Sequence, residues 1–152
     1  GLCYEGLAWV TGAAVMAGGA MPDGRTLALA ALYSAGAHGI MTLNDFKAVE
    51  GDKRMGIASL PVQLGVQGAA RTACLMMLAP QFVVVMLLIF WGAPMHGITV
   101  GALMLLQALL MDYFLDKPVD RALLYSGFGV PLFVAGMMVS AFALRTLGQA
   151  AA

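Results

Sequence analysis

The sequence predicts an all-α fold, a polytopic bundle of about five transmembrane helices. Of the 152 residues, 61% are hydrophobic and 11% are charged, whereas soluble domains average roughly 45–50% and about 25%. A water-soluble chain of this length would lack the polar side chains to cover its surface, which excludes an ordinary cytosolic enzyme and a disordered segment. The eight basic and eight acidic residues cancel, so we expect no nucleic acid partner.

Uncharged runs define the expected spans in chain order. Four runs of 17, 19, 40 and 23 residues contain no charged side chain, and a turn-forming stretch at 92–97 divides the longest. Leu, Met and Ala dominate the third and fourth spans and no strand-like alternation is sustained, which favours helices over barrel strands. Since a span needs about 20 residues, we expect one partial transmembrane domain over 1–152 with spans near 6–21, 26–45, 72–92, 97–115 and 122–144.

The basic residues predict the orientation of these spans. Two of them, Arg25 and Arg145, lie on one side of the expected bundle. Six lie in the connections on the other side: Lys47, Lys53, Arg54, Arg71, Lys117 and Arg121. By the positive-inside rule, the connections that carry the six face the cytoplasm.

A dense cluster of charges follows the second expected span. Six of the sixteen charged residues fall within ten positions: Asp45, Lys47, Glu50, Asp52, Lys53 and Arg54. If the helix continues past the span, Asp45 and Asp52 share one of its faces, two turns apart. Gly51 is expected to end that helix in a left-handed conformation and to fold Asp52 back toward the site.

Mixed charges at one site suit a metal-bound polyphosphate. Mg²⁺ is usually held by one or two carboxylates together with substrate phosphates and water, a role open to Asp45 and Asp52. Lys47, Lys53 and Arg54 can neutralise the remaining phosphate oxygens. The alternative interpretation is a charged loop that is simply solvated at the membrane surface.

The same segment resembles a known family. Residues 44–52, followed by 55–57 and 59–62, resemble the second aspartate-rich motif of the UbiA-type intramembrane prenyltransferases. Within that superfamily the similarity is greatest to the chlorophyll and bacteriochlorophyll synthase branch. It begins at 1–7, continues through 35–43 and reaches 136–138, so that it covers essentially the whole chain.

The resemblance implies a nine-helix bundle whose two aspartate-rich loops face the cytoplasm of a bacterial inner or photosynthetic membrane. The five spans would be the last five, and the first aspartate-rich motif would precede Gly1. We therefore expect the missing N-terminal helices of the same protein to be required, and the 152-residue chain to be inactive alone.

The resemblance also implies a reaction, the final step of (bacterio)chlorophyll synthesis. A geranylgeranyl or phytyl diphosphate would esterify the propionate of (bacterio)chlorophyllide with Mg²⁺ as cofactor. Asp45 and Asp52 would be the catalytic, metal-holding residues, and Lys47, Lys53 and Arg54 would bind the diphosphate.

Weaker candidates would line the acceptor or cation pocket: Tyr4, Glu5, His38, Asn44 and Tyr113. His38 lies seven residues before Asp45, so it is placed to face the same cavity, where it would ligate a tetrapyrrole metal or orient the acceptor. The alternative is a structural histidine satisfied by a neighbouring helix. Tyr4 and Glu5 open the first span on the cytoplasmic side. Tyr113, which ends the fourth span there, would stabilise an allylic cation or anchor the helix at the interface.

A second function remains open at this point. A non-catalytic membrane subunit derived from such an enzyme would pack against photosynthetic pigment–protein complexes, and the missing first motif favours it. The retained charge cluster favours the enzyme, because a packing subunit has no use for it.

Overall fold

The computed structural model describes the backbone of residues 2–150 and the side chains of Cys3 and residues 6–148. Within this part of the chain every regular element is a helix, so the predicted all-α fold is confirmed. The helices are α1 (Leu2–Met16), α2 (Gly24–Asp45), α3 (Val49–Met55), α4 (Leu60–Phe90), α5 (Pro94–Asp116) and α6 (Pro118–Ala150).

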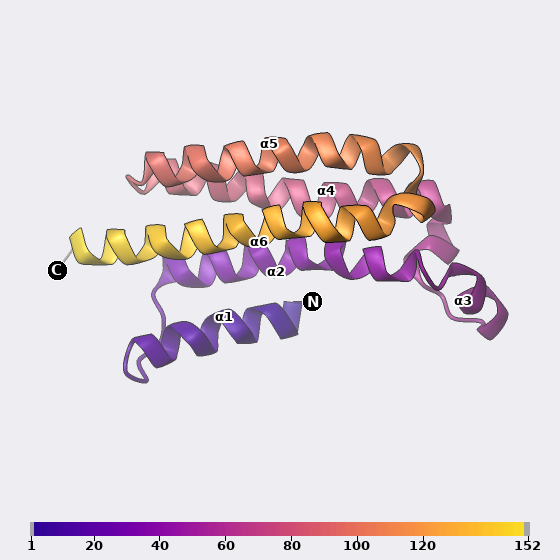
Figure 1. Cartoon of the computed structure of the whole chain (residues 1–152). Coiled ribbons are helices and arrows are strands. Elements are labelled where there is room, and N and C mark those ends of the chain that lie inside the picture. Colours follow the sequence, from indigo (N-terminus) through magenta and orange to yellow (C-terminus); the bar gives the residue numbers. More distant parts are fainter. Residues whose placement is uncertain (1, 151–152) are drawn as a thin grey trace.

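Four long helices form the body of the molecule. Helices α2, α4, α5 and α6 lie side by side, and α1 packs against α2 (Figure 1). The short helix α3 projects at one end of the bundle, beside the start of α4 and the α5–α6 connection. The α1–α2 and α4–α5 connections lie at the opposite end, as does the C-terminal end of α6. The two groups of loops therefore separate as the charge pattern predicts.

The lengths of the helices identify the membrane-spanning elements. Helices α2, α4, α5 and α6 are each long and apolar enough to cross a bilayer. Helix α1 differs from the expected span at 6–21, because it ends at Met16 and a turn with Gly18 and Gly19 at positive φ follows. Its 15 residues reach only about 22 Å, against a hydrocarbon core of about 30 Å.

Helix α4 begins twelve residues before the expected span at 72–92. Pro61 occupies its first turn, and Gly65, with φ 73° and ψ 160°, interrupts the helical geometry. A charged residue limits the part of a helix that lies in lipid, but the helix can continue beyond it into water. Arg71 therefore does not mark the start of α4. Helix α6 extends beyond 122–144 for the same reason.

Two glycines of α2 allow close contact with the neighbouring helices α4 and α6. A Cβ atom at Gly39 would collide with the Ala73 carbonyl and would lie 2.6 Å from the Met77 side chain. One at Gly36 would lie 2.6 Å from the ring of Phe133 on α6. Because lipid supplies no hydrophobic drive between helices, small residues at such positions let the backbones approach.

Candidate functional site at the end of α2

A buried phenylalanine anchors the charged segment to the bundle. Phe46, the residue after α2, is 2% exposed and meets the ring of Phe114 edge-on, with the ring centroids 5.6 Å apart. The turn is closed by the backbone N–H of Ala48, which donates to the Asp45 carbonyl at 3.0 Å. Asp45 and Lys47 thus flank a fixed point. Sequence reasoning missed Phe46, although a lone aromatic residue among charges was a signal.

Helix α3 carries the rest of the charge cluster. Val49 is buried and ties its first turn to the protein, while Glu50, Lys53 and Arg54 are exposed. The predicted helix end at Gly51 is wrong, because α3 continues through it to Met55. Gly56 ends the helix with φ 69°, and the following N–H of Ile57 donates to the Asp52 carbonyl at 2.9 Å. This left-handed ending is the one that glycine accommodates without steric cost.

The two candidate metal-holding carboxylates come from different helices. The expected continuous helix through Asp45 and Asp52 is wrong, because residues 46–48 form a turn between α2 and α3. The turn nevertheless leaves both side chains half-buried, on consecutive helices at one end of the bundle. Like charges held together repel, and a divalent cation between them would relieve that repulsion.

The three cations around the carboxylates differ in their partners. Lys53 forms an exposed ion pair with Glu50, with 3.8 Å between Nζ and Oε1. Lys47 and Arg54 are exposed, and neither takes part in an ion pair with another described side chain. These two side chains are therefore available to an anionic ligand, and the weak Glu50 pair is readily exchanged.

A pocket of about 330 Å³ opens beside Asp45. Its walls come from one face of α2 and from α4, and its lining residues are His38, Met41, Thr42, Asp45, Leu60 and Met76. The imidazole and the carboxylate thus face one cavity, whose other walls are largely apolar. Positions 38, 41, 42 and 45 have the spacing of one helix face. The sequence alone could therefore have identified Met41 and Thr42 as lining residues of this pocket. The contribution of α4 needed the tertiary structure.

The other candidates lie away from this pocket. The ring of Tyr113 is covered by the Arg121 guanidinium, 3.8 Å from the ring centroid, and Arg121 also pairs with Asp116 at 3.0 Å. Asn44 is exposed, and its carbonyl accepts the Lys47 N–H at 3.2 Å. Neither residue lines the pocket with His38.

The first helix begins beside the middle of α2. The side chains of Tyr4 and Glu5 lie outside the described residues. Gly6 is level with Ser34, since a Cβ atom at Gly6 would lie 3.3 Å from the Ser34 hydroxyl. Ser34 precedes Asp45 by 11 residues, about 16 Å along the helix. This part of α1 therefore lies about that distance along α2 from the charge cluster, and the roles expected of Tyr4 and Glu5 stay predictions.

The donor set suits a magnesium ion that also binds substrate oxygen. Nowhere in the described chain do three His, Cys, Asp or Glu side chains gather as a metal-binding group. Asp45 and Asp52 flank one turn between two helices, and Mg²⁺ commonly takes one or two carboxylates and completes its octahedron with phosphate and water. Asp45 and Asp52 fit that requirement, and they need the other ligands from elsewhere.

These features define a helical membrane protein with a mixed acidic and basic site at one end of its bundle. Residues 2–128 match the UbiA prenyltransferase family, and the chain belongs to that family. The resemblance seen in the charged motif is thereby confirmed.

Three relatives indicate the branch of the family. The chain is 51% identical over 146 residues to the bacteriochlorophyll synthase 33 kDa chain of Cereibacter sphaeroides, covering 96% of this chain and 48% of the relative. It is 40% identical to the 34 kDa chain of Chloroflexus aurantiacus, covering 94% and 45%. It is 35% identical to the chloroplastic chlorophyll synthase of Arabidopsis thaliana, covering 94% and 36%. The chain thus spans at most about half the length of these relatives. No solved structure matches the chain significantly.

Proposed function

We propose that this chain forms one side of the active site of a prenyltransferase that esterifies the propionate of (bacterio)chlorophyllide with a geranylgeranyl or phytyl chain. The observation that carries the proposal is the pocket that Asp45 shares with His38, with the cations of α3 following the same turn. The names of the relatives point to the same branch of prenyl transfer.

The charge cluster would bind the leaving group. Asp45 and Asp52 would hold Mg²⁺, which supplies positive charge to the diphosphate oxygens. Lys47 and Arg54 would donate hydrogen bonds to the same diphosphate. As the allylic carbon–oxygen bond breaks, its electron pair leaves with the diphosphate, and preorganised positive charge stabilises that transition state. A propionate oxygen then forms the new ester bond to the allylic carbon.

The pocket along α2 would receive the acceptor. His38 lies two turns deeper than Asp45, between the apolar walls that Met41 and Met76 provide. An imidazole there would contact the tetrapyrrole, either as a ligand of its central metal or by orienting its propionate. The methionines adapt their shape to a large flat ring or to a prenyl chain.

The site would be completed by protein outside this chain. The described residues offer the two carboxylates of Asp45 and Asp52, and no three candidate metal ligands gather among them. A diphosphate gripped from one side only would be poorly positioned for transfer. We therefore propose a second acidic segment on missing N-terminal helices, and an active site that faces the cytoplasm of a bacterial inner or photosynthetic membrane.

Substitution of the two carboxylates tests this function. In the complete enzyme, Asp45→Asn and Asp52→Asn should each lower kcat by roughly 10²–10³ at saturating Mg²⁺, the cost of losing one electrostatic stabiliser of a transition state. The matched control is Asp112→Asn, an exposed acid on α5 at the same end of the bundle. Esterified pigment is measured from bacteriochlorophyllide and geranylgeranyl diphosphate. Turnover within threefold of the control in both variants would overturn the proposal.

A further inference from the structure

A second and larger pocket lies at the end of the bundle away from the charge cluster. Its volume is about 600 Å³, within the roughly 300–1,000 Å³ of small-molecule sites. Its walls come from the start of α2, the end of α4 and the last turns of α6: Asp23, Gly24, Arg25, Trp91, Leu144, Leu147 and Gly148. Arg25 precedes Asp45 by 20 residues, about 30 Å of helix, so this pocket is separate from the proposed active site.

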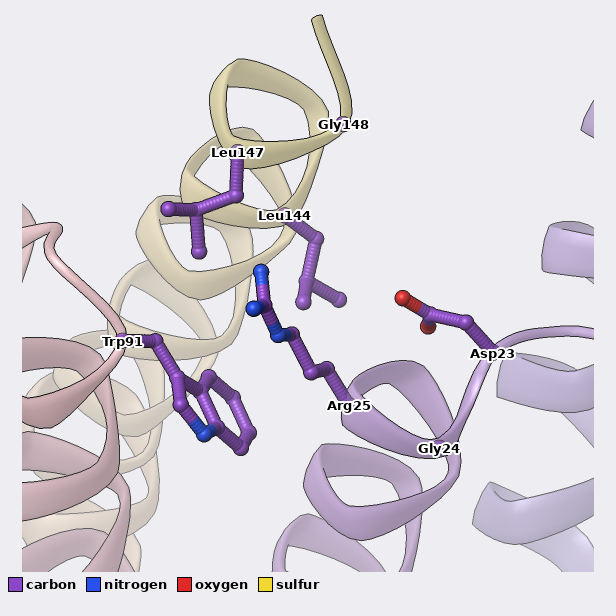
Figure 2. Close-up of a pocket in the computed structure, with 7 residues that line it drawn as sticks. All are labelled: Asp23, Gly24, Arg25, Trp91, Leu144, Leu147 and Gly148. Atoms are coloured by element: carbon purple, nitrogen blue, oxygen red, sulfur yellow. The ribbon is translucent and has the colours of Figure 1, made fainter. Parts of the chain in front are cut away.

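One cation enters this pocket from α2. Figure 2 shows the Arg25 side chain extending from the start of α2 toward Leu144 and Leu147, with Trp91 beside it. The guanidinium carbon lies 5.8 Å from the centroid of the Trp91 ring. No hydrogen bond or ion pair joins Arg25 to another described side chain. Its donors are thus free for an acceptor that occupies the pocket.

A carboxylate stands at the other side of the same opening. Asp23 caps α2, and its Oδ1 accepts the Thr26 N–H at 2.8 Å. Hydrogen bonds from the Thr26 side chain and backbone N–H, assisted by the nearby Arg25 charge, hold the pKa of Asp23 below its ordinary value. The carboxylate is therefore charged at neutral pH, and its two oxygens have more acceptor sites than the Thr26 contacts fill, so that it can also accept from a ligand. A purely anionic ligand would meet repulsion here.

The surroundings place this pair of charges at a membrane surface. Arg25 and Asp23 lie where the spanning helix α2 begins, and Trp91 ends the spanning part of α4. Tryptophan at a helix end is typical of the headgroup level of a bilayer. Leu144 and Leu147 give the pocket an apolar wall on α6 that an acyl chain can cover.

We propose that this pocket binds a zwitterionic phospholipid through its phosphoethanolamine headgroup. The phosphate accepts hydrogen bonds from the Arg25 guanidinium, and the primary ammonium donates to the Asp23 carboxylate. The acyl chain lies along Leu144 and Leu147. A choline headgroup has the same charges but no N–H to donate, and a glycerol headgroup has no cation to pair with Asp23. The charges thus specify phosphatidylethanolamine.

Lipid titration of the purified, delipidated protein tests the proposal. Native mass spectrometry measures the bound fraction of phosphatidylethanolamine, phosphatidylcholine and phosphatidylglycerol with identical acyl chains. We expect phosphatidylethanolamine to bind about tenfold more tightly than the other two, the effect of one charge-assisted hydrogen bond. Equal binding of the three lipids would overturn the proposal.

Three variants assign the two ends of the headgroup. Arg25→Gln should weaken phosphatidylethanolamine binding about tenfold. Asp23→Asn, which keeps a good helix cap, should abolish the preference over phosphatidylglycerol. Arg145→Gln is the control, because this exposed residue of α6 is not among those that line the pocket. Unchanged binding in Arg25→Gln, or an unchanged preference in Asp23→Asn, would overturn the assignment.

Discussion

Phe46 holds the charged segment at the end of α2. It lies between Asp45 and Lys47, and its ring packs on Phe114, which in turn contacts Tyr125 with ring centroids 5.3 Å apart. The aromatic contacts fix the turn from inside, while Asp45 is half-buried at the pocket and Lys47 is exposed. The positions of the catalytic candidates therefore depend on a residue that itself has no part in the chemistry.

Truncation of this anchor should damage both stability and activity. Phe46→Ala should lower the free energy of unfolding by about 3–5 kcal/mol, the usual cost of removing a buried phenylalanine. Turnover should fall as well, because the turn that positions Asp45 loses its fixed point. Phe142→Ala is the control, since Phe142 is 56% exposed on α6. Thermal unfolding in detergent and the prenyl-transfer assay measure the two effects, and equal stability of both variants would contradict this role.

For individual residues, the sequence predicted which side chains gather at the site better than it predicted how they are placed relative to one another. The charge cluster and the shared face of His38 and Asp45 follow from spacing alone, because both lie within one helix. The relative placement of Asp45 and Asp52 could not be predicted from spacing, because a turn that begins at the buried Phe46 interrupts the helix between them. Tyr113 was expected to stabilise an allylic cation or to anchor its helix, and spacing could not reveal that the Arg121 guanidinium of the following helix lies over its ring.

The contact between α2 and α4 places the pocket walls. Helix α2 supplies His38 and Asp45, and α4 supplies Met76. Gly39 lies between these pocket residues of α2 and allows α4 to approach, since any side chain there would meet the Ala73 carbonyl. The width of the pocket thus depends on one position without a side chain.

Addition of one methyl group at this contact should separate the helices. Gly39→Ala should destabilise the protein by about 1–3 kcal/mol, as overpacking does in close-packed interiors. Gly12→Ala is the matched control, because a Cβ atom at Gly12 meets no other atom within 4 Å, and alanine favours a helix. Melting temperatures of the two variants measure the difference. A melting temperature of Gly39→Ala equal to that of Gly12→Ala would contradict the close approach of α2 and α4.

Helix boundaries were harder to predict than helix identity. Uncharged runs report the part of a helix that lies in lipid, so the spans near 26–45 and 97–115 agree closely with α2 and α5. They do not report helix that continues into water, which is why α4 and α6 begin earlier than expected. Two glycines lie near the cluster, and the sequence did not show which of them ends the helix. In the structure α3 continues through Gly51 and ends at Gly56.

The whole molecule presents two chemically different ends. One carries α3 with the charge cluster, and the other carries Asp23, Arg25 and Trp91 (Figure 1). The order of the spans and the separation of the loops were predictable from charge alone. The position of α1 along the bundle could not be predicted from charge, because its 15 residues cover only part of the length of α2.

Labelling from the two sides of the membrane tests this arrangement. Lys53→Cys and Met95→Cys place thiols at exposed positions at opposite ends of the bundle. A membrane-impermeant maleimide applied to intact cells should label residue 95 and not residue 53, because the positive-inside rule puts α3 in the cytoplasm. Permeabilised cells should show labelling of both thiols. Equal labelling of the two in intact cells would contradict the topology.

The central claim is that this chain supplies one of the two sides that grip the diphosphate. The most direct measurement is prenyl transfer by the purified 152-residue chain with bacteriochlorophyllide, geranylgeranyl diphosphate and Mg²⁺. It is made with and without a second polypeptide, the portion of the Cereibacter sphaeroides relative that this chain does not match. We predict esterified pigment only from the mixture, and loss of that activity in Asp45→Asn. Esterified pigment from the 152-residue chain alone would contradict the claim.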